Sequence, residues 1–262
     1  MVGRTGVSAA AATEAMHADD ALRALADPDH ARAAATYFKT GTGEYGEGDQ
    51  FYGVRVPQVR ELARQFNTLS LDGCVALLQS PYNEARLMAL AILVRRFEKG
   101  DSETQEAVYT TFMAQRHRVN NWNLVDSSAP FISGPYLLGR DRSVLRKLVG
   151  SPVMWDRRIA VLSTFAFIRA RDLVETLSLC EMLLADDQDL MHKACGWMLR
   201  ELGKRDEAAL LGFIQSHYGA MPRTMLRYAI EKFEPETRGC LLRGDFSSLS
   251  PHIHSTLGTP VC

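Results

Sequence analysis

The stretch VNNWNLVDSSAP at residues 119–130 combines side chains that can do chemistry. In a helix, Trp122 and Asp126 would lie one turn apart, within about 40° of each other on one face. A carboxylate can stabilise a cation that develops during a reaction, and an indole attracts a cation to its ring face. Asn120 and Asn121 stand in front of the pair, where we favour a helix cap over a ligand contact. The alternative is a core tryptophan beside an aspartate that caps a helix or forms an ion pair.

A second group of such residues lies further along the chain. Trp197 and Arg200, in KACGWMLRELGKRD, are three residues apart and therefore share one helix face. Arg158, in WDRRIAVL, precedes them by about one helical repeat. Arginines placed in this way can bind phosphate, or they can form structural ion pairs with neighbouring acids.

The elements that position these residues are expected to be helices. Helical periodicity dominates residues 20–243, and long alternating strand patterns are absent. In NEARLMALAILVRRF, for example, one stripe holds Leu87, Leu90, Ala91 and Val94. Small residues recur at helix centres with gaps of 71, 34 and 35 residues, at Ala89, Ala160, Ala194 and Ala229. Half of the first gap falls near Val125, and one step back from Ala89 falls near Val54.

A period near 35 residues predicts stacked helical pairs. We therefore expect an all-α fold: a HEAT-like helical-repeat solenoid, C-shaped, with a concave cleft that suits a rod-like partner. A helical bundle without true repeats is the alternative. The expected domain organisation is a flexible leader at 1–19, the solenoid at 20–243 and a flexible C-terminal tail at 244–262.

A glycine-rich stretch, KTGTGEYGEGDQFYGVRVP, occupies residues 39–57. It is no phosphate-binding Walker loop, because no GK[ST] follows, and its acids would repel phosphate. The simpler interpretation, which we favour, is a turn between helices, with Pro57 in the first turn of the next helix. The other is a loop that shapes one end of the cleft.

Composition excludes several classes of protein. The chain of 262 residues has a net charge of −1, so the total gives no sign of a polyanion partner. Five cysteines with long spacings predict reduced thiols and a cytoplasmic protein. We expect no metal site, because the seven histidines and the cysteines lack ligand spacing. We expect no membrane span either, since the longest clear apolar run, LMALAILV, has eight residues.

Taken together, four stretches resemble the DNA alkylation repair family of AlkD-like HEAT-repeat proteins. They are YFKTGTGEYGEGDQFYGVRVPQVRELA, NNWNLVD, WDRRIAVL and KACGWMLRELGKRD, and the resemblance covers roughly residues 20–240. It implies a C-shaped solenoid that holds duplex DNA in its concave cleft. It also implies removal of N3- or N7-alkylated purines without flipping of the base into a pocket.

The resemblance assigns roles to individual residues. It implies that Asp126 and Trp122 are catalytic and that Trp197 frames the sugar of the lesion. It implies that Arg158 and Arg200 line the DNA cleft. Near the N-terminal end of the cleft it places Tyr37 and Arg55, and Arg55 stands where the best-studied branch has an uncharged amide.

The sequence thus predicts a DNA glycosylase that excises cationic alkylpurines from duplex DNA, in base excision repair. We expect no cofactor, a monomer, and a cytoplasmic location, associated with the nucleoid if the source is bacterial. The alternative is a non-catalytic HEAT-like module of the same superfamily that binds DNA or a protein partner. The intact Trp122 and Asp126 favour the enzyme, whereas the acidic glycine-rich stretch favours the module.

Overall fold

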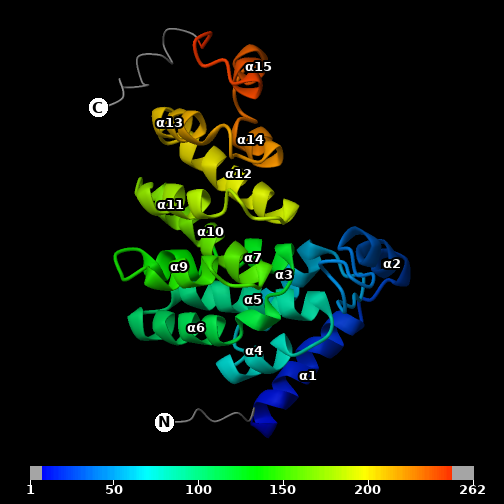
Figure 1. Cartoon of the computed structure of the whole chain (residues 1–262). Coiled ribbons are helices and arrows are strands. Elements are labelled where there is room, and N and C mark those ends of the chain that lie inside the picture. The colour runs from blue at the N-terminus through cyan, green and yellow to red at the C-terminus, as the bar shows by residue number, and fades with distance from the viewer. Residues whose placement is uncertain (1–7, 250–262) are drawn as a thin grey trace. The chain divides into compact units, whose positions relative to one another are not determined.

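The computed structural model describes residues 8–249 (Figure 1). Every regular element in this range is a helix, and the one pairing of strand type is an isolated bridge between Gln50 and Tyr82. The predicted all-α, helical-repeat class is therefore confirmed. The C shape of the solenoid stays a prediction.

The chain forms two compact units, and the boundary between them falls between Tyr136 and Leu137. The expected flexible leader at 1–19 was wrong for its second half, because the first helix begins at Ala9. Its alanines give a helix a small apolar face, and Ala11, Ala15 and Ala18 are buried. The first residues of the predicted leader, 1–7, and the end of the predicted tail, 250–262, lie outside the described residues.

The first unit is built around one long helix, α5. This helix packs against α1, α3, α4, α6 and α7, and most of its side chains are buried. The elements of this unit are α1 (Ala9–Arg23), α2 (Pro28–Tyr37), α3 (Val56–Gln65), α4 (Leu71–Leu78), α5 (Asn83–Lys99), α6 (Ser102–Ala114), the 3-10 turn η1 (Arg116–Arg118), α7 (Trp122–Asp126) and, across the boundary, α8 (Ser133–Leu137).

The second unit is a stack of helices in two layers. One layer runs through α10, α12 and α14, each in contact with the next, and α9 and α11 touch in the other layer (Figure 1). Its helices are α9 (Ser143–Val149), α10 (Met154–Arg169), α11 (Val174–Met182), α12 (Asp189–Gly203), α13 (Glu207–His217), α14 (Arg223–Ala229) and α15 (Pro235–Arg243).

The predicted repeat matches most of this architecture. Its four alanine positions lie in α5, α10, α12 and α14, and each alanine is at most 1% exposed. Val125 is likewise buried in α7. The step back to Val54 fails, because that residue precedes α3 in a non-helical segment.

Small residues allow the close helix packing that the period suggested. At Gly196 in α12, a Cβ atom would lie 2.5 Å from the Cβ of Tyr228 and 2.6 Å from the carbonyl oxygen of Met225. Both neighbours belong to α14. Any larger residue at Gly196 would push α12 and α14 apart, and the residue that follows, Trp197, would shift with α12.

Candidate active site

The two residues of the opening motif lie on the short helix α7. The side-chain oxygen of Asn121 accepts a hydrogen bond from the backbone N–H of Trp122 at 2.8 Å, so Asn121 is the helix cap, as predicted. Leu124 and Val125 are fully buried and hold the inner face of the helix. Trp122 and Asp126, four residues apart, are left on the face that remains partly exposed.

Both residues line one pocket of about 790 Å³ within the first unit. Helices α3, α5 and α7 supply most of its wall, together with the end of α2. Part of its floor is the apolar stripe of α5 that the sequence showed, because Leu87, Ala91 and Val94 face the pocket while Leu90 is fully buried. The lining consists of Tyr37, Phe38, Val56, Arg60, Ala63, Arg64, Leu87, Ala91, Val94, Arg95, Glu98, Trp122, Asn123, Asp126, Ser127 and Phe131.

One wall of the pocket is aromatic. Phe38 stacks on Trp122 with ring centroids 5.0 Å apart and an angle of 17° between the planes. Phe51 stacks in turn on Phe38, also at 5.0 Å. Tyr37 approaches Trp122 edge-on at 5.9 Å and 77°. These contacts fix the plane of the Trp122 indole, because offset stacks and edge-on pairs are the favoured aromatic geometries.

The pocket also carries positive charge. Arg64 on α3 forms an ion pair with Glu61 on the same helix. Arg60 on α3 and Arg95 on α5 line the same pocket, and neither makes a hydrogen bond or ion pair with any other residue in the range 8–249. These two guanidinium groups are therefore available to an anionic ligand.

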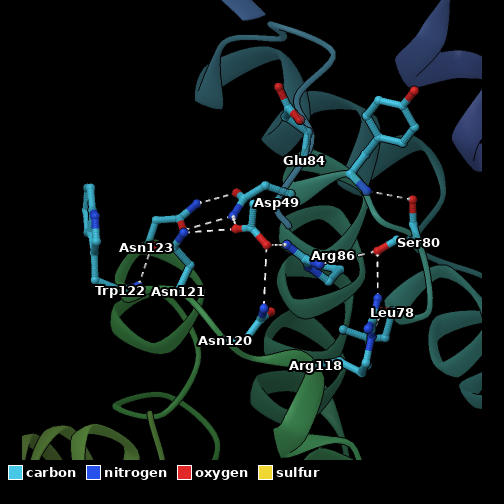
Figure 2. Close-up of polar contacts among 12 residues, drawn as sticks. Asp49, Leu78, Ser80, Glu84, Arg86, Arg118, Asn120, Asn121, Trp122 and Asn123 are labelled. Carbon is cyan, nitrogen blue, oxygen red and sulfur yellow. Dashed lines mark hydrogen bonds and ion pairs between the residues drawn. The ribbon is translucent and has the colours of Figure 1, made fainter. Parts of the chain in front are cut away.

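The glycine-rich stretch is partly the turn that we favoured, and Pro57 does lie in the first turn of α3. Two of its acids stabilise their own turns: Glu44 accepts the N–H of Gly41, and Glu47 accepts the N–H of Gly43. Asp49 behaves differently, because its side chain is 1% exposed and its carboxylate binds residues near α7 (Figure 2).

The end of this stretch is anchored by Glu84. The carboxylate of Glu84, in the first turn of α5, accepts three backbone N–H groups, from Tyr52, Gly53 and Val54. Burial raises the pKa of Glu84, while the backbone hydrogen bonds act in the opposite direction. Gly53 has φ 85°, and a Cβ atom there would lie 2.1 Å from the carbonyl oxygen of Asp27, so the close approach requires glycine.

Three of the predicted site residues belong to the second unit. Trp197 and Arg200 share α12 as expected, and the ring centroid of Trp197 lies 6.5 Å from that of Phe165 on α10. Arg200 forms ion pairs with Glu231 and, at 3.4 Å, with Glu201.

The charge around Arg200 is shared among several groups. A hydrogen bond from Lys232, and then the positive charge of Arg200, lower the pKa of Glu231. Lys204 binds Glu201 at 2.8 Å. Arg200 is thus part of an ion-pair network, and a structural ion pair was the alternative interpretation of this residue from the sequence.

Arg158 on α10 is buried, at 4% exposure, and donates from Nη1 to the carbonyl oxygen of Leu190 at 2.7 Å. Because Leu190 lies in α12, this bond joins neighbouring repeats, as the spacing suggested. Trp155, three residues earlier, is a core residue at 8% exposure.

Tyr37 and Arg55, the two remaining residues predicted to contact DNA, differ in position. Tyr37 is 66% exposed and lines the pocket with Trp122 and Asp126. Arg55 occupies the N-cap position of α3, outside that lining, and its Nη2 lies 3.1 Å from Nε2 of His30. Within the first unit, the structure therefore brings Tyr37, Trp122 and Asp126 together, whereas Arg55 is linked to the pocket only as the neighbour of Val56 in the sequence.

No cysteine is among the described residues that line this pocket. Cys74, Cys180, Cys195 and Cys240 are free and buried, and burial raises the pKa of Cys74 to about 12. Cys262 lies outside the described residues. In the part of the chain that the structure describes, no three His, Cys, Asp or Glu side chains form a group that could hold a metal ion. No helix in that part is long and apolar enough to cross a membrane.

Comparison with known families decides the relationship of the chain. The family model described as "DNA alkylation repair enzyme" matches residues 18–233, which is most of the sequence. The chain belongs to this family. The match includes every predicted site residue from Tyr37 to Arg200.

A solved structure supports the fold of this family member. It is described as "Predicted DNA alkylation repair enzyme from Enterococcus faecalis" and superimposes with a TM-score of 0.63 at 16% sequence identity. The similarity covers 80% of this chain and 98% of the other. No curated protein matches the chain.

The sequence did carry a signal for the pocket arginines that we missed. Arg60 and Arg64 are four residues apart in VPQVRELARQ, so they share a face of α3. Arg95 directly follows the apolar stripe of α5, at Val94. The basic residues at the end of this stripe and its small residue Ala91 are the features that fit the wall of a pocket.

Proposed function

We propose that this member of the alkylation repair family is a DNA glycosylase that releases cationic N3- or N7-alkylated purines from duplex DNA. Family membership supports the coarser statement, a role in the repair of alkylated DNA. One observation supports the more specific proposal of a glycosylase. Trp122 and Asp126 line a single pocket together with two arginines, Arg60 and Arg95, that have no partner among the described residues.

The chemistry needs few groups. Alkylation at N3 or N7 places a positive charge on the purine, so the base can leave as a neutral molecule. The C1′–N bond breaks, its electron pair goes to the purine, and the sugar becomes an oxocarbenium cation. A general acid on the leaving group is unnecessary, in contrast to an ordinary glycosidase with its two carboxylates.

Asp126 serves this reaction in two ways. Its negative charge stabilises the cation that forms at C1′, where a preorganised charge has most effect. Its carboxylate also orients a water molecule, whose oxygen bonds to C1′ while its proton passes to the carboxylate and then to solvent. Trp122 presents its indole to the same cation, an attraction of about 0.5–2 kcal/mol.

The arginines hold the DNA. A guanidinium group binds phosphate oxygens in a bidentate geometry, and such contacts fix the register of a protein on a duplex. In this proposal Arg60 and Arg95 bind the backbone beside the lesion, and Tyr37 and Arg55 extend the contact. This proposal gives no DNA contact to Arg158, which is buried and bonded to the carbonyl oxygen of Leu190. The roles that the family resemblance implies for Trp197 and Arg200 stay predictions.

Substrate charge gives the decisive experiment. Purified protein is incubated with duplexes that each contain one lesion, and abasic sites are scored. We expect release of N7-methylguanine and N3-methyladenine, and no release of uracil or 1,N6-ethenoadenine. These uncharged bases would leave as anions unless a general acid protonated them, and in this proposal Asp126 acts as a carboxylate and supplies no proton. The base also need not enter a pocket that reads its edge, as it does in base-flipping enzymes.

Other outcomes separate the alternatives. Release of uracil would keep the enzyme class but overturn the mechanism. If the folded protein releases no base yet binds duplex DNA, the non-catalytic module of the same superfamily is the better description.

A further inference from the structure

Asp49 links the glycine-rich stretch to the helix that carries the proposed catalytic residues. One carboxylate oxygen, Oδ1, accepts Nη2 of Arg86 at 2.6 Å. The other, Oδ2, accepts Nδ2 of Asn83 at 3.0 Å and Nδ2 of Asn121 at 2.9 Å (Figure 2). Asn120 approaches Oδ1 at 3.5 Å. The carboxylate therefore joins three segments: the glycine-rich stretch, the start of α5 and the start of α7.

Asn121 transmits this link to Trp122. Its amide nitrogen binds Asp49, and its amide oxygen accepts the backbone N–H of Trp122 at 2.8 Å. A second amide pair supports the first, because Nδ2 of Asn123 donates to Oδ1 of Asn83 at 2.7 Å. Asn121 itself is fully buried, so neither of its bonds competes with water.

The segment that carries Asp49 is also in close contact with α7. At Gly46 a Cβ atom would lie 2.2 Å from the carbonyl oxygen of Phe38 and 3.2 Å from Nδ2 of Asn121. Phe38 and Phe51, on the two sides of this segment, form the stack against Trp122. Besides Asp49, Phe38 thus contacts α7 directly, and Phe51 supports Phe38 from the other side of the stack.

A helix as short as α7 needs such support. It has five residues, little more than one turn, and an isolated helix of this length has no stability of its own in water. Its direction is therefore set by what binds its ends and its buried face. The hydrogen bond that Asn121 donates to Asp49 has a carboxylate as its acceptor, which makes it stronger than a hydrogen bond between neutral groups.

We propose that Asp49 is a positioning residue, which acts through Asn121 to hold Trp122 and Asp126 toward the pocket. This inference rests on the proposed function for its effect on rate, but not for its effect on Trp122. Asp49 is absent from the pocket lining, so it acts through α7 and touches no substrate. The buried guanidinium of Arg86 pairs with this carboxylate at 2.6 Å.

The sharpest variant is Asn121→Ser. A serine hydroxyl still caps α7, because serine is among the best N-cap residues, but it has no amide to reach Asp49. Asp49→Asn is the second variant, and it retains shape while it removes the charge. Asn67→Ser is the matched control, since Asn67 is an exposed residue whose amide donates to the carbonyl of Arg64.

Two measurements are made on folded full-length protein. The first is single-turnover release of N7-methylguanine, with DNA affinity determined separately. The second is the fluorine NMR spectrum of protein labelled with 5-fluorotryptophan, in which the three tryptophans are assigned by Trp→Phe substitution. The spectrum reports the surroundings of Trp122 whether or not the protein is active.

For Asn121→Ser we expect the release rate to fall about 10-fold to 100-fold with little change in DNA affinity, because small misplacements of a reacting group have effects of this size. The Trp122 resonance should shift or broaden, while those of Trp155 and Trp197 stay in place. Asn67→Ser should change neither rate nor spectrum.

Each other outcome has a separate meaning. An unchanged rate and an unchanged Trp122 resonance in folded Asn121→Ser and Asp49→Asn would overturn the positioning role. If the wild type releases no base, the proposed function fails, and the fluorine spectrum alone then decides whether Asp49 positions Trp122. A loss of rate with all three resonances unmoved would also contradict the inference.

Discussion

Two arginines of the first unit and two of the second differ in what they bind. In the first unit, Arg60 and Arg95 line the pocket without a hydrogen bond or ion pair to any residue between 8 and 249. In the second unit, Arg200 forms ion pairs with two glutamates, and Arg158 is 4% exposed and bonded to a backbone carbonyl. Motif resemblance selected the second pair. Whether a guanidinium group is free to bind phosphate depends on its neighbours in the fold, and a sequence motif does not show these neighbours.

The tryptophans show the same contrast. Trp122 is held in a stack by Phe38 at 5.0 Å and by Tyr37 edge-on. Trp197 has a looser aromatic neighbour, Phe165, at 6.5 Å and a tilt of 43°. The first indole is fixed by its aromatic neighbours, whereas the second depends on the packing of its helix, α12, against α14.

The largest expected effect is on the rate of base release, when a carboxylate of the first unit is compared with one of the second. Asp126→Asn should reduce base release by about 100-fold or more, because it removes a preorganised charge from the developing cation. Asp156→Asn, on α10, should change release little, since Asp156 is a buried residue that accepts a hydrogen bond from Ser151. Single-turnover rates at equal DNA occupancy measure both.

Equal activity of Asp126→Asn and wild type would end the catalytic assignment of the first unit. A loss of folding in Asp126→Asn, seen by circular dichroism, would instead favour the structural explanation of that residue.

The next prediction separates structural arginines from binding arginines by stability. Arg158→Ala should lower the free energy of unfolding by about 1–3 kcal/mol, because the carbonyl of Leu190 loses its donor in a buried site. Arg60→Ala should change it by less than about 0.5 kcal/mol, as is usual for an exposed residue without partners. Urea denaturation compares the two. If Arg158→Ala is as stable as wild type and binds DNA less well, the contact predicted from the sequence is supported, and DNA binding is not confined to the arginines of the first unit.

Salt dependence then tests the proposed phosphate contacts directly. Arg60→Ala and Arg95→Ala should each reduce the slope of log K against log salt by about 0.9, the value expected when a protein neutralises one phosphate fewer. Arg200→Ala should reduce it less, because its charge is already shared with Glu201 and Glu231. Arg32→Ala is the control, since Arg32 is exposed on α2, outside the pocket lining, and pairs with Asp29. Slopes that are equal in all four variants would remove the distinction between the units.

The helices and their repeat could be predicted from the sequence because both are periodic. Ala89, Ala160 and Ala194 lie near the centres of α5, α10 and α12, whereas Ala229 is the last residue of α14. All four are buried, and their small size is visible in the sequence. The leader was misjudged because the small alanine face of α1 resembles a low-complexity segment. Residues 9–23 become helical by packing against other helices, in particular α4.

The site was predictable only in part, for a different reason. Trp122 and Asp126 share a face at helical spacing, so one element suffices to bring them together. Asp49 and Asn121 are 72 residues apart, and their bond depends on how the glycine-rich stretch folds. No periodic signal connects such positions, which is why the acid in a glycine-rich turn looked unremarkable in the sequence.

The smallest expected effect concerns the aromatic neighbours of the two tryptophans. Tyr37→Ala should lower base release by about 2-fold to 10-fold, because an aromatic pair contributes roughly 0.5–1.5 kcal/mol beyond its buried area. Tyr37→Phe should retain the wild-type rate, since the contact to Trp122 is made by the ring. Phe165→Leu should leave the rate nearly unchanged, because its ring lies further from Trp197. If Tyr37→Phe is as slow as Tyr37→Ala, the hydroxyl of Tyr37 contacts the DNA itself, and its role beside Trp122 is secondary.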